Sequence, residues 1–257
     1  MSKARRRKNQ NRQTHPIDEM MRFQYRWVRE FSVVYPDIWG AIGSGINIVQ
    51  MTQWMIGHQP DPSMVEVHRL VMWQTVLDYQ IQSIILILQH KLDSGLALLR
   101  MAAELSRDVY VIGSDQARMD LWMEKEKQRR EYQEIFKFDK SFPPAKIVHD
   151  IYKLCSKFGV HGHVSNNVFS ELKGRAGKDG QLALLDVSQI GIVESVGTWL
   201  MGFAPMHHLC SNEFFTSQPA ELFKEFSDWH EFELSFMELV QLFHASLNEL
   251  KQESRSE

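Results

Sequence analysis

The chain has few cysteines and lacks the short motifs that mark several enzyme classes. Its 257 residues contain two cysteines, Cys155 and Cys210, and no Cys-x-x-Cys pair. Two thiols cannot build a disulfide framework, so we expect reduced cysteines and a cytoplasmic protein. No His-Glu-x-x-His and no paired Glu-x-x-His occurs, which argues against a zinc protease and a di-iron bundle. No Gly-x-Ser-x-Gly occurs either, so a nucleophile elbow is not expected.

Long apolar runs are absent as well. The most apolar stretch, residues 182–205, is interrupted by Asp186, Glu194 and several smaller polar residues, so we expect no membrane span. No apolar run follows the basic N-terminus, so a secretory signal is not expected. No repeat of fixed period and no domain-sized linker occurs, which predicts one domain over residues 14–254.

Acidic residues are missing from the first seventeen positions, although the whole chain has a net charge of −3. Six basic residues lie there: Lys3, Arg5, Arg6, Arg7, Lys8 and Arg12. We expect residues 1–13 to be a disordered arm, because they are basic and polar, with asparagine and glutamine between the charges. Two interpretations stay open. The arm binds the phosphates of RNA or DNA through Arg5, Arg6 and Arg7, or it is a solubilising tail.

The remaining sequence has the apolar periodicity and capping signals of helices almost throughout. It predicts an all-α bundle of about eight or nine helices, in which an apolar helix face could also mediate a homodimer. One short strand or extended segment is expected at residues 182–187. The expected helices cover residues 17–35, 37–57, 62–91, 94–112, 115–136, 143–158, 188–215 and 217–253.

Glycines are concentrated in the second of these helices. Gly40, Gly43 and Gly45 either pack tightly against a neighbour or permit another helix to approach closely. A phosphate-binding loop is not expected, because no strand precedes them and no helix starts after them.

The helix at residues 94–112 carries charges on a largely apolar background. Arg100, Glu104, Arg107 and Asp108 follow a spacing of i, i+4, i+7 and i+8, so they share one face. The first interpretation is a ladder of intrahelical pairs, Arg100 with Glu104 and then Glu104 with Arg107. The second is a polar cluster between helices, in which Arg100 and Glu104 meet a partner from elsewhere in the chain.

The segment from His161 to Asn167 is the richest in uncharged hydrogen-bonding side chains. His161 and His163 either cap and pack against a helix end, or serve acid–base chemistry or anion binding together with Ser165 and Asn166. Two histidines at i and i+2 can also ligate a metal from a loop. That would need a third ligand from among Glu104, Asp108, His149 and His208, and we predict neither a metal nor a cofactor.

Two stretches, residues 96–112 and 151–165, resemble an uncharacterised, mainly bacterial, all-helical family of unknown function. Its members carry an "LLR…E" helix and a later "Y..LS…H" segment, matched here by Arg100, Glu104, Tyr152 and His161. Cys155 stands where that pattern has serine. The group is compared with the HEPN superfamily (higher eukaryotes and prokaryotes nucleotide-binding), which includes ribonuclease toxins of defence systems.

The resemblance implies either a helical binding or regulatory domain or a ribonuclease, and it does not decide between them. HEPN ribonucleases use an arginine followed four to six residues later by histidine, and no arginine in this chain has that spacing. The chemistry would therefore require Arg100 and His161 to converge from different helices, with the imidazole as general acid or base and the guanidinium stabilising phosphorane charge. The two hypotheses are a helical binding or regulatory domain, and a metal-independent ribonuclease that uses Arg100, Glu104 and His161. Asp108, Tyr152, His163, Ser165 and Asn166 are the expected binding residues.

Overall fold

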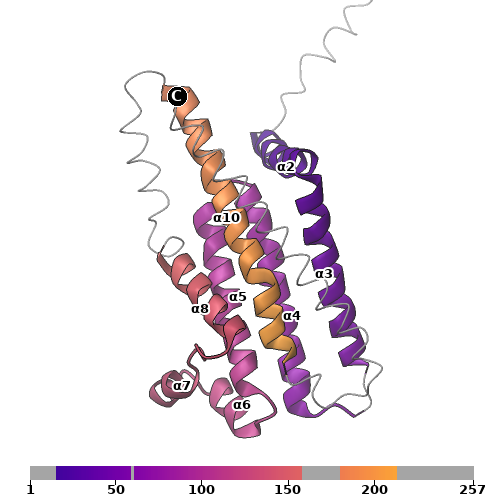
Figure 1. Ribbon diagram of the computed structural model, residues 1–257, viewed down its shortest axis with the longest axis vertical. Coiled ribbons are helices and arrows are strands. Elements are labelled where there is room, and N and C mark those ends of the chain that lie inside the picture. The colour runs from indigo at the N-terminus through magenta and orange to yellow at the C-terminus, as the bar shows by residue number, and fades with distance from the viewer. Residues whose placement is uncertain (1–15, 59–60, 158–179, 213–257) are drawn as a thin grey trace, which may run out of the picture.

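The computed structural model describes residues 16–58, 61–157 and 180–212, and every regular element in these ranges is helical (Figure 1). The all-α fold class is therefore confirmed. The helices are α2 (Pro16–Val34), α3 (Pro36–Gly57), α4 (Met64–Leu88), α5 (Leu92–Ile112), α6 (Gln116–Met123), α7 (Arg129–Ile135), α8 (Pro143–Cys155) and α10 (Gly180–Ser211). The expected basic arm, the segment from His161 to Asn167 and the expected helix at 217–253 lie outside the described residues.

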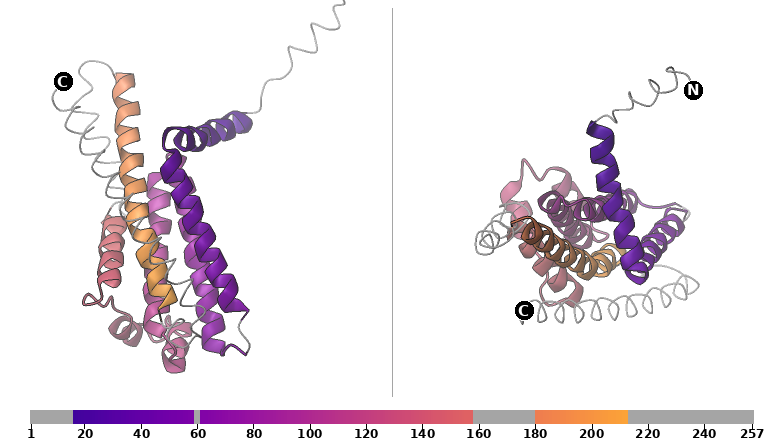
Figure 2. Two further views of the ribbon diagram at one scale, coloured as in Figure 1. Left: turned by 45° about the vertical axis from the view of Figure 1, so that its right-hand side comes forward. Right: turned by 90° about the horizontal axis from the view of Figure 1, so that it is seen from above.

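Four helices form the centre of the bundle. Helices α4 and α5 pack as a hairpin, and α10 lies along both of them, with α8 against α5 and α10 (Figure 1). Helix α3 flanks α4, and α2 turns away across one end of the bundle (Figure 2). The interior is filled by large side chains such as Trp73, Leu77, Trp199 and Phe203, each almost completely buried. Burying one such side chain contributes about 1.5–3 kcal/mol to folding.

Side-chain hydrogen bonds join α4 to α10 within this apolar interior. The Trp73 indole Nε1 donates to His207 Nδ1 at 2.8 Å, and the Trp199 indole Nε1 donates to the Gln80 carbonyl at 2.8 Å. Buried Arg69 donates to the Asn212 carbonyl at 2.8 Å, just past the end of α10. These long-range bonds fix the register of the two helices, because buried polar groups are costly unless they are partnered.

Helix α4 also passes a length-and-composition test for a membrane span, and it is the one helix in the described ranges that does. A buried core helix passes the same test. The position of α4 between α3, α5 and α10 is that of a core helix.

Helix α4 begins two residues later than the sequence predicted. Asp61, which directly precedes the predicted start, has a φ of 52° and is not in the extended conformation of an N-cap residue. Ser63 caps the helix instead, through a reciprocal pair in which Ser63 Oγ accepts from the Glu66 amide and Glu66 Oε2 accepts from the Ser63 amide. This capping box satisfies two amides that would otherwise lack partners, which is why the start moves to Ser63.

The single helix expected at residues 115–136 is wrong. It is two short helices, α6 and α7, separated by turns over residues 124–128. Asp115, and not Ser114, is its N-cap, with Oδ1 accepting from the Ala117 amide at 2.8 Å. The break reverses the chain so that Trp122 and Tyr132 both reach α5, a tertiary contact that helical periodicity does not reveal.

The strand expected at residues 182–187 is also wrong, because these residues belong to α10. The helix continues through Pro205 to Ser211. A lone extended segment would leave its backbone groups unpaired, and the described part of the chain offers no strand to pair with it.

Helices α4 and α5 are in close contact at Gly95. A Cβ added there would lie 2.7 Å from Ile87 Cγ1 and 3.0 Å from the Ser83 carbonyl oxygen, while Ser83 Oγ donates to the Gly95 carbonyl at 2.7 Å. We expect Gly95→Ala to lower the free energy of unfolding by about 1–3 kcal/mol, because the backbones must separate. Urea unfolding measures this change. Ser94→Ala, an exposed neighbour in the same turn, is the control, and an equal effect of both substitutions would contradict the close packing.

Candidate functional site

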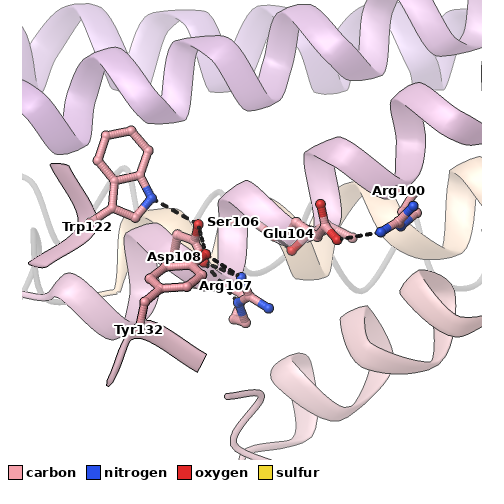
Figure 3. A network of polar contacts seen from close by, with 8 residues as sticks. Arg100, Glu104, Ser106, Arg107, Asp108, Trp122 and Tyr132 are labelled. Atoms are coloured by element: carbon pink, nitrogen blue, oxygen red, sulfur yellow. Dashed lines mark hydrogen bonds and ion pairs between the residues drawn. The ribbon is translucent and has the colours of Figure 1, made fainter. Parts of the chain in front are cut away.

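Arg100 and Glu104 form the pair that the first interpretation of α5 predicted. Arg100 Nη2 lies 2.9 Å from Glu104 Oε1, and the two side chains are 28% and 34% exposed (Figure 3). Tyr152 of α8 adds the contribution from elsewhere in the chain, because the Arg100 guanidinium lies 5.2 Å from its ring centroid. Burial would lower the pKa of Arg100, but Glu104 and Tyr152 outweigh it and the pKa is raised. Arg100 is thus a permanent cation at the surface between α5 and α8.

Three buried nitrogen atoms of Arg100 and His149 have no hydrogen-bond partner among the described residues. They are Nε of Arg100 and both ring nitrogens of His149. His149 lies one turn before Tyr152 and packs on Phe138, with ring centroids 4.9 Å apart. Its pKa is lowered, first by burial and then by the nearby charges of Lys153 and Lys140. The i, i+3 spacing of His149 and Tyr152 places both side chains on one face of α8.

Asp108 lies further along α5 at the centre of a separate network. Its Oδ1 accepts two hydrogen bonds from Arg107, and its Oδ2 accepts from the Trp122 indole at 2.9 Å and the Tyr132 hydroxyl at 2.8 Å (Figure 3). Arg107 also donates to the Tyr132 oxygen at 2.9 Å, and its guanidinium lies 5.3 Å from the Phe138 ring centroid. The expected pair of Arg107 with Glu104 is therefore replaced by a pair with Asp108.

Electrostatics inside this network keep the Tyr132 hydroxyl and the Arg107 guanidinium protonated, so both remain hydrogen-bond donors. Burial and then the Asp108 carboxylate raise the pKa of Tyr132 far above its ordinary value, so its hydroxyl stays protonated. Burial would lower the pKa of Arg107, but Asp108 and Tyr132 outweigh it and the pKa is raised. The Asp108 carboxylate accepts four hydrogen bonds from its own chain. Two of the donors, Trp122 and Tyr132, lie on α6 and α7, so Asp108 attaches both helices to α5. Its expected role as a binding residue stays a prediction.

Several predicted site residues cannot be placed relative to Arg100. His161, His163, Ser165 and Asn166, together with Arg5, Arg6 and Arg7, lie outside the described residues. The convergence of Arg100 and His161 therefore stays a prediction. Within residues 16–58, 61–157 and 180–212, no three histidine, cysteine or acidic side chains are grouped to hold a metal ion.

The outer face of α2 carries a second candidate site, which the sequence analysis missed. Arg22, Tyr25, Arg26 and Arg29 follow the spacing i, i+3, i+4 and i+7 and are all exposed, with Tyr25 at 60%. Arg26 is held by Glu30 at 2.6 Å. The helix lies across the end of the bundle, clear of its sides (Figure 2). The available signal was the spacing of the three arginines, which places them with Tyr25 on one face of the expected helix.

Charge is strongly segregated along the chain. Residues 1–29 contain nine lysines or arginines and two acidic residues, whereas the rest contains 20 basic and 30 acidic residues. The N-terminal part is thus at +7 and the remainder at −10. A polyanion would be attracted to the first part, six of whose nine basic residues lie at positions 3–12, and repelled by the second.

The comparisons with known proteins add no relative. No protein-family model matches the chain, and no curated protein or solved structure matches it significantly.

Proposed function

We propose that this protein is a helical binding domain for single-stranded nucleic acid, which it engages through its N-terminal arm and the outer face of α2. The observation that carries the proposal is the exposed set of Arg22, Tyr25, Arg26 and Arg29 at the end of an otherwise acidic chain. Arginines neutralise phosphates, and an exposed tyrosine between them offers a surface on which a base can stack. Arg5, Arg6 and Arg7 extend the same positive charge.

Single-stranded substrates fit this face better than a duplex. A row of arginines with an interleaved aromatic ring suits a strand whose bases are unstacked, because duplex bases have no free face to stack on Tyr25. Affinity should depend strongly on salt, with a slope of log K against log salt of about −0.7 for each phosphate neutralised.

The first test replaces the three arginines of α2 with glutamine in the full chain. We expect the salt slope for a fluorescent single-stranded RNA to fall by about 2, because about 0.7 is lost for each of three phosphate contacts. Tyr25→Ala should weaken binding by about 1–3 kcal/mol. Fluorescence anisotropy across a salt series measures both quantities, and a DNA strand of the same sequence distinguishes RNA from DNA.

The matched control makes the same charge change elsewhere. Lys127, Arg129 and Arg130 are exposed around the start of α7, and their triple glutamine variant removes three positive charges. Equal losses in both triple variants would show that net charge alone matters, and the α2 site would then be abandoned.

A metal-independent ribonuclease is the second candidate, and the position of Arg100 favours it. The Arg100 guanidinium is partly exposed and contacts Glu104 and Tyr152, which raise its pKa. Its Nε has no hydrogen-bond partner among the described residues. In this mechanism His161 removes the proton of the attacking ribose 2′-hydroxyl, and Arg100 stabilises the negative charge on the phosphorane. The bond from phosphorus to the 5′-oxygen then breaks, and the leaving oxygen takes a proton from the protonated His161 or from water. RNA cleavage that is unchanged in both His161→Ala and Arg100→Lys would remove these residues from the mechanism, and binding without cleavage supports the binding domain.

A further inference from the structure

The outward face of α3 has almost no charge. Gly40, Gly43, Asn47, Met51 and Trp54 recur every three or four positions and are all exposed, with Met51 at 65% and Trp54 at 64%. The one charged residue among the 22 of α3 lies in its first turn. A helix at the side of a bundle normally turns charged residues outward, whereas depletion of charge with enrichment of Trp and Met marks the centre of a protein interface.

Gly40 and Gly43 of this face pack against nothing among the described residues. A Cβ added at Gly40 or Gly43 would meet nothing within 4 Å, so tight packing, one of the two interpretations of these glycines, does not hold at either position. Each lies within a regular helix without a positive φ, where glycine costs about 1 kcal/mol relative to alanine. The remaining interpretation is the close approach of another helix, which the described residues do not supply.

The spacing of the face identifies that helix as a second copy of α3. If two copies run antiparallel about a two-fold axis at Asn47, Gly43 of one lies opposite Met51 of the other. In the same register Gly40 lies opposite Trp54. The glycines of each helix thus face the large side chains of the other copy. Such a self-complementary face is what an isologous dimer requires. The amides of the two Asn47 side chains can hydrogen bond across the axis, because each has both donors and an acceptor.

We propose that this protein forms a two-fold dimer in which α3 packs antiparallel on α3 of a second copy, centred on Asn47. The absence of charge removes the repulsion that two identical faces would otherwise have. This inference is independent of nucleic-acid binding, because it uses a different helix.

The size of the face sets the expected strength. Helix α3 has eleven exposed residues, about half of the roughly 20 per partner in a standard-size interface. Exposed Val67 and Val71 of the neighbouring α4 could enlarge the interface at its edge. From this small contact area we expect a weak dimer that dissociates on dilution.

Sedimentation velocity of the full chain over a hundredfold concentration range tests the proposal. The wild type is expected to shift from monomer to dimer, and Trp54→Glu to stay monomeric with unchanged helical circular dichroism. Met123→Glu is the matched control, because Met123 is 60% exposed on α6, and it should dimerise as the wild type does. A wild-type monomer at every concentration, or a dimer that survives Trp54→Glu, overturns the proposal. So does a monomer that sediments with neutral phosphatidylcholine vesicles, since the face would then bind lipid.

A cysteine at the axis tests the register. Asn47→Cys places a thiol opposite its own copy, and an oxidant should link the two chains, whereas Met123→Cys should stay unlinked. The native thiols do not interfere, because Cys155 and Cys210 are fully buried and burial raises the pKa of Cys155 to about 12. A dimer in which Asn47→Cys fails to cross-link overturns the Asn47-centred packing.

Gly43→Ala gives a signature that a role within the chain would not give. The methyl group improves helix propensity, so the monomer should unfold at a higher temperature. At the same time it enters the space that Met51 of the second copy occupies, and dimer affinity should fall about tenfold. A more stable protein with unchanged affinity would contradict the proposed contact.

Discussion

Asp108→Ala is expected to lower the free energy of unfolding by about 3–5 kcal/mol, because it removes one partner of a buried ion pair. The Asp108 side chain is 4% exposed and that of Arg107 is 15% exposed, so the guanidinium would be left largely buried without its counter-charge. The Trp122 indole and the Tyr132 hydroxyl would lose their common acceptor as well. Urea unfolding gives the loss, and amide hydrogen exchange should show that α6 and α7 open first.

Glu104→Ala is the matched control on the same helix. Glu104 is 34% exposed and makes one pair with Arg100, so its removal should cost less than about 1 kcal/mol. Tyr132→Phe should fall between the two, because it keeps the ring and loses the hydroxyl that bonds both Arg107 and Asp108. Comparable losses for Asp108→Ala and Glu104→Ala would contradict the anchoring role of Asp108.

The network also shows why the sequence predicts helices better than their connections. Caps and periodicity are local, and they place α2, α3 and α5 within one or two residues of the structure. The turns at residues 124–128 have no such signal. They exist because Trp122 and Tyr132 both bond Asp108, a contact between residues far apart in the chain.

The same limit applies to the site. The spacing of Arg100 and Glu104 predicts their pairing, since i and i+4 always face one another on a helix. The spacing cannot show that Arg107 turns away from Glu104 toward Asp108, because that choice depends on Tyr132 arriving from α7. It also cannot show that the outward face of α3 is exposed, which depends on which side α4 covers.

Stability should fall steeply with acidity through one buried imidazole, His207. It is 0% exposed, accepts a hydrogen bond from the Trp73 indole at Nδ1, and packs against the Phe203 ring with centroids 4.6 Å apart. Burial lowers its pKa from 6.5 to about 3. Protonation would place a charge in an apolar interior and put a proton on the nitrogen that accepts from Trp73, so the folded state resists it.

The direction of the pH effect follows from which state binds the proton. Between pH 6.5 and about 3 the unfolded chain is protonated at His207 and the folded chain is not. The free energy of unfolding therefore falls with decreasing pH across this window, by about 1.4 kcal/mol per pH unit from this group alone. The contribution is fully present above pH 6.5 and lost toward pH 3.

Urea unfolding from pH 7 to pH 4 of the wild type and His207→Asn isolates this group. The asparagine carbonyl can accept from Trp73 but does not titrate, so the variant should be less stable at pH 7 through lost packing and should lose less stability on acidification. The two curves should converge as the pH falls. Trp73→Phe is the complementary control, because it removes the donor and keeps the imidazole, and its curve should stay as steep as that of the wild type. Parallel curves for the wild type and His207→Asn would mean that His207 is protonated in the folded protein, and its burial between α4 and α10 would then need another explanation.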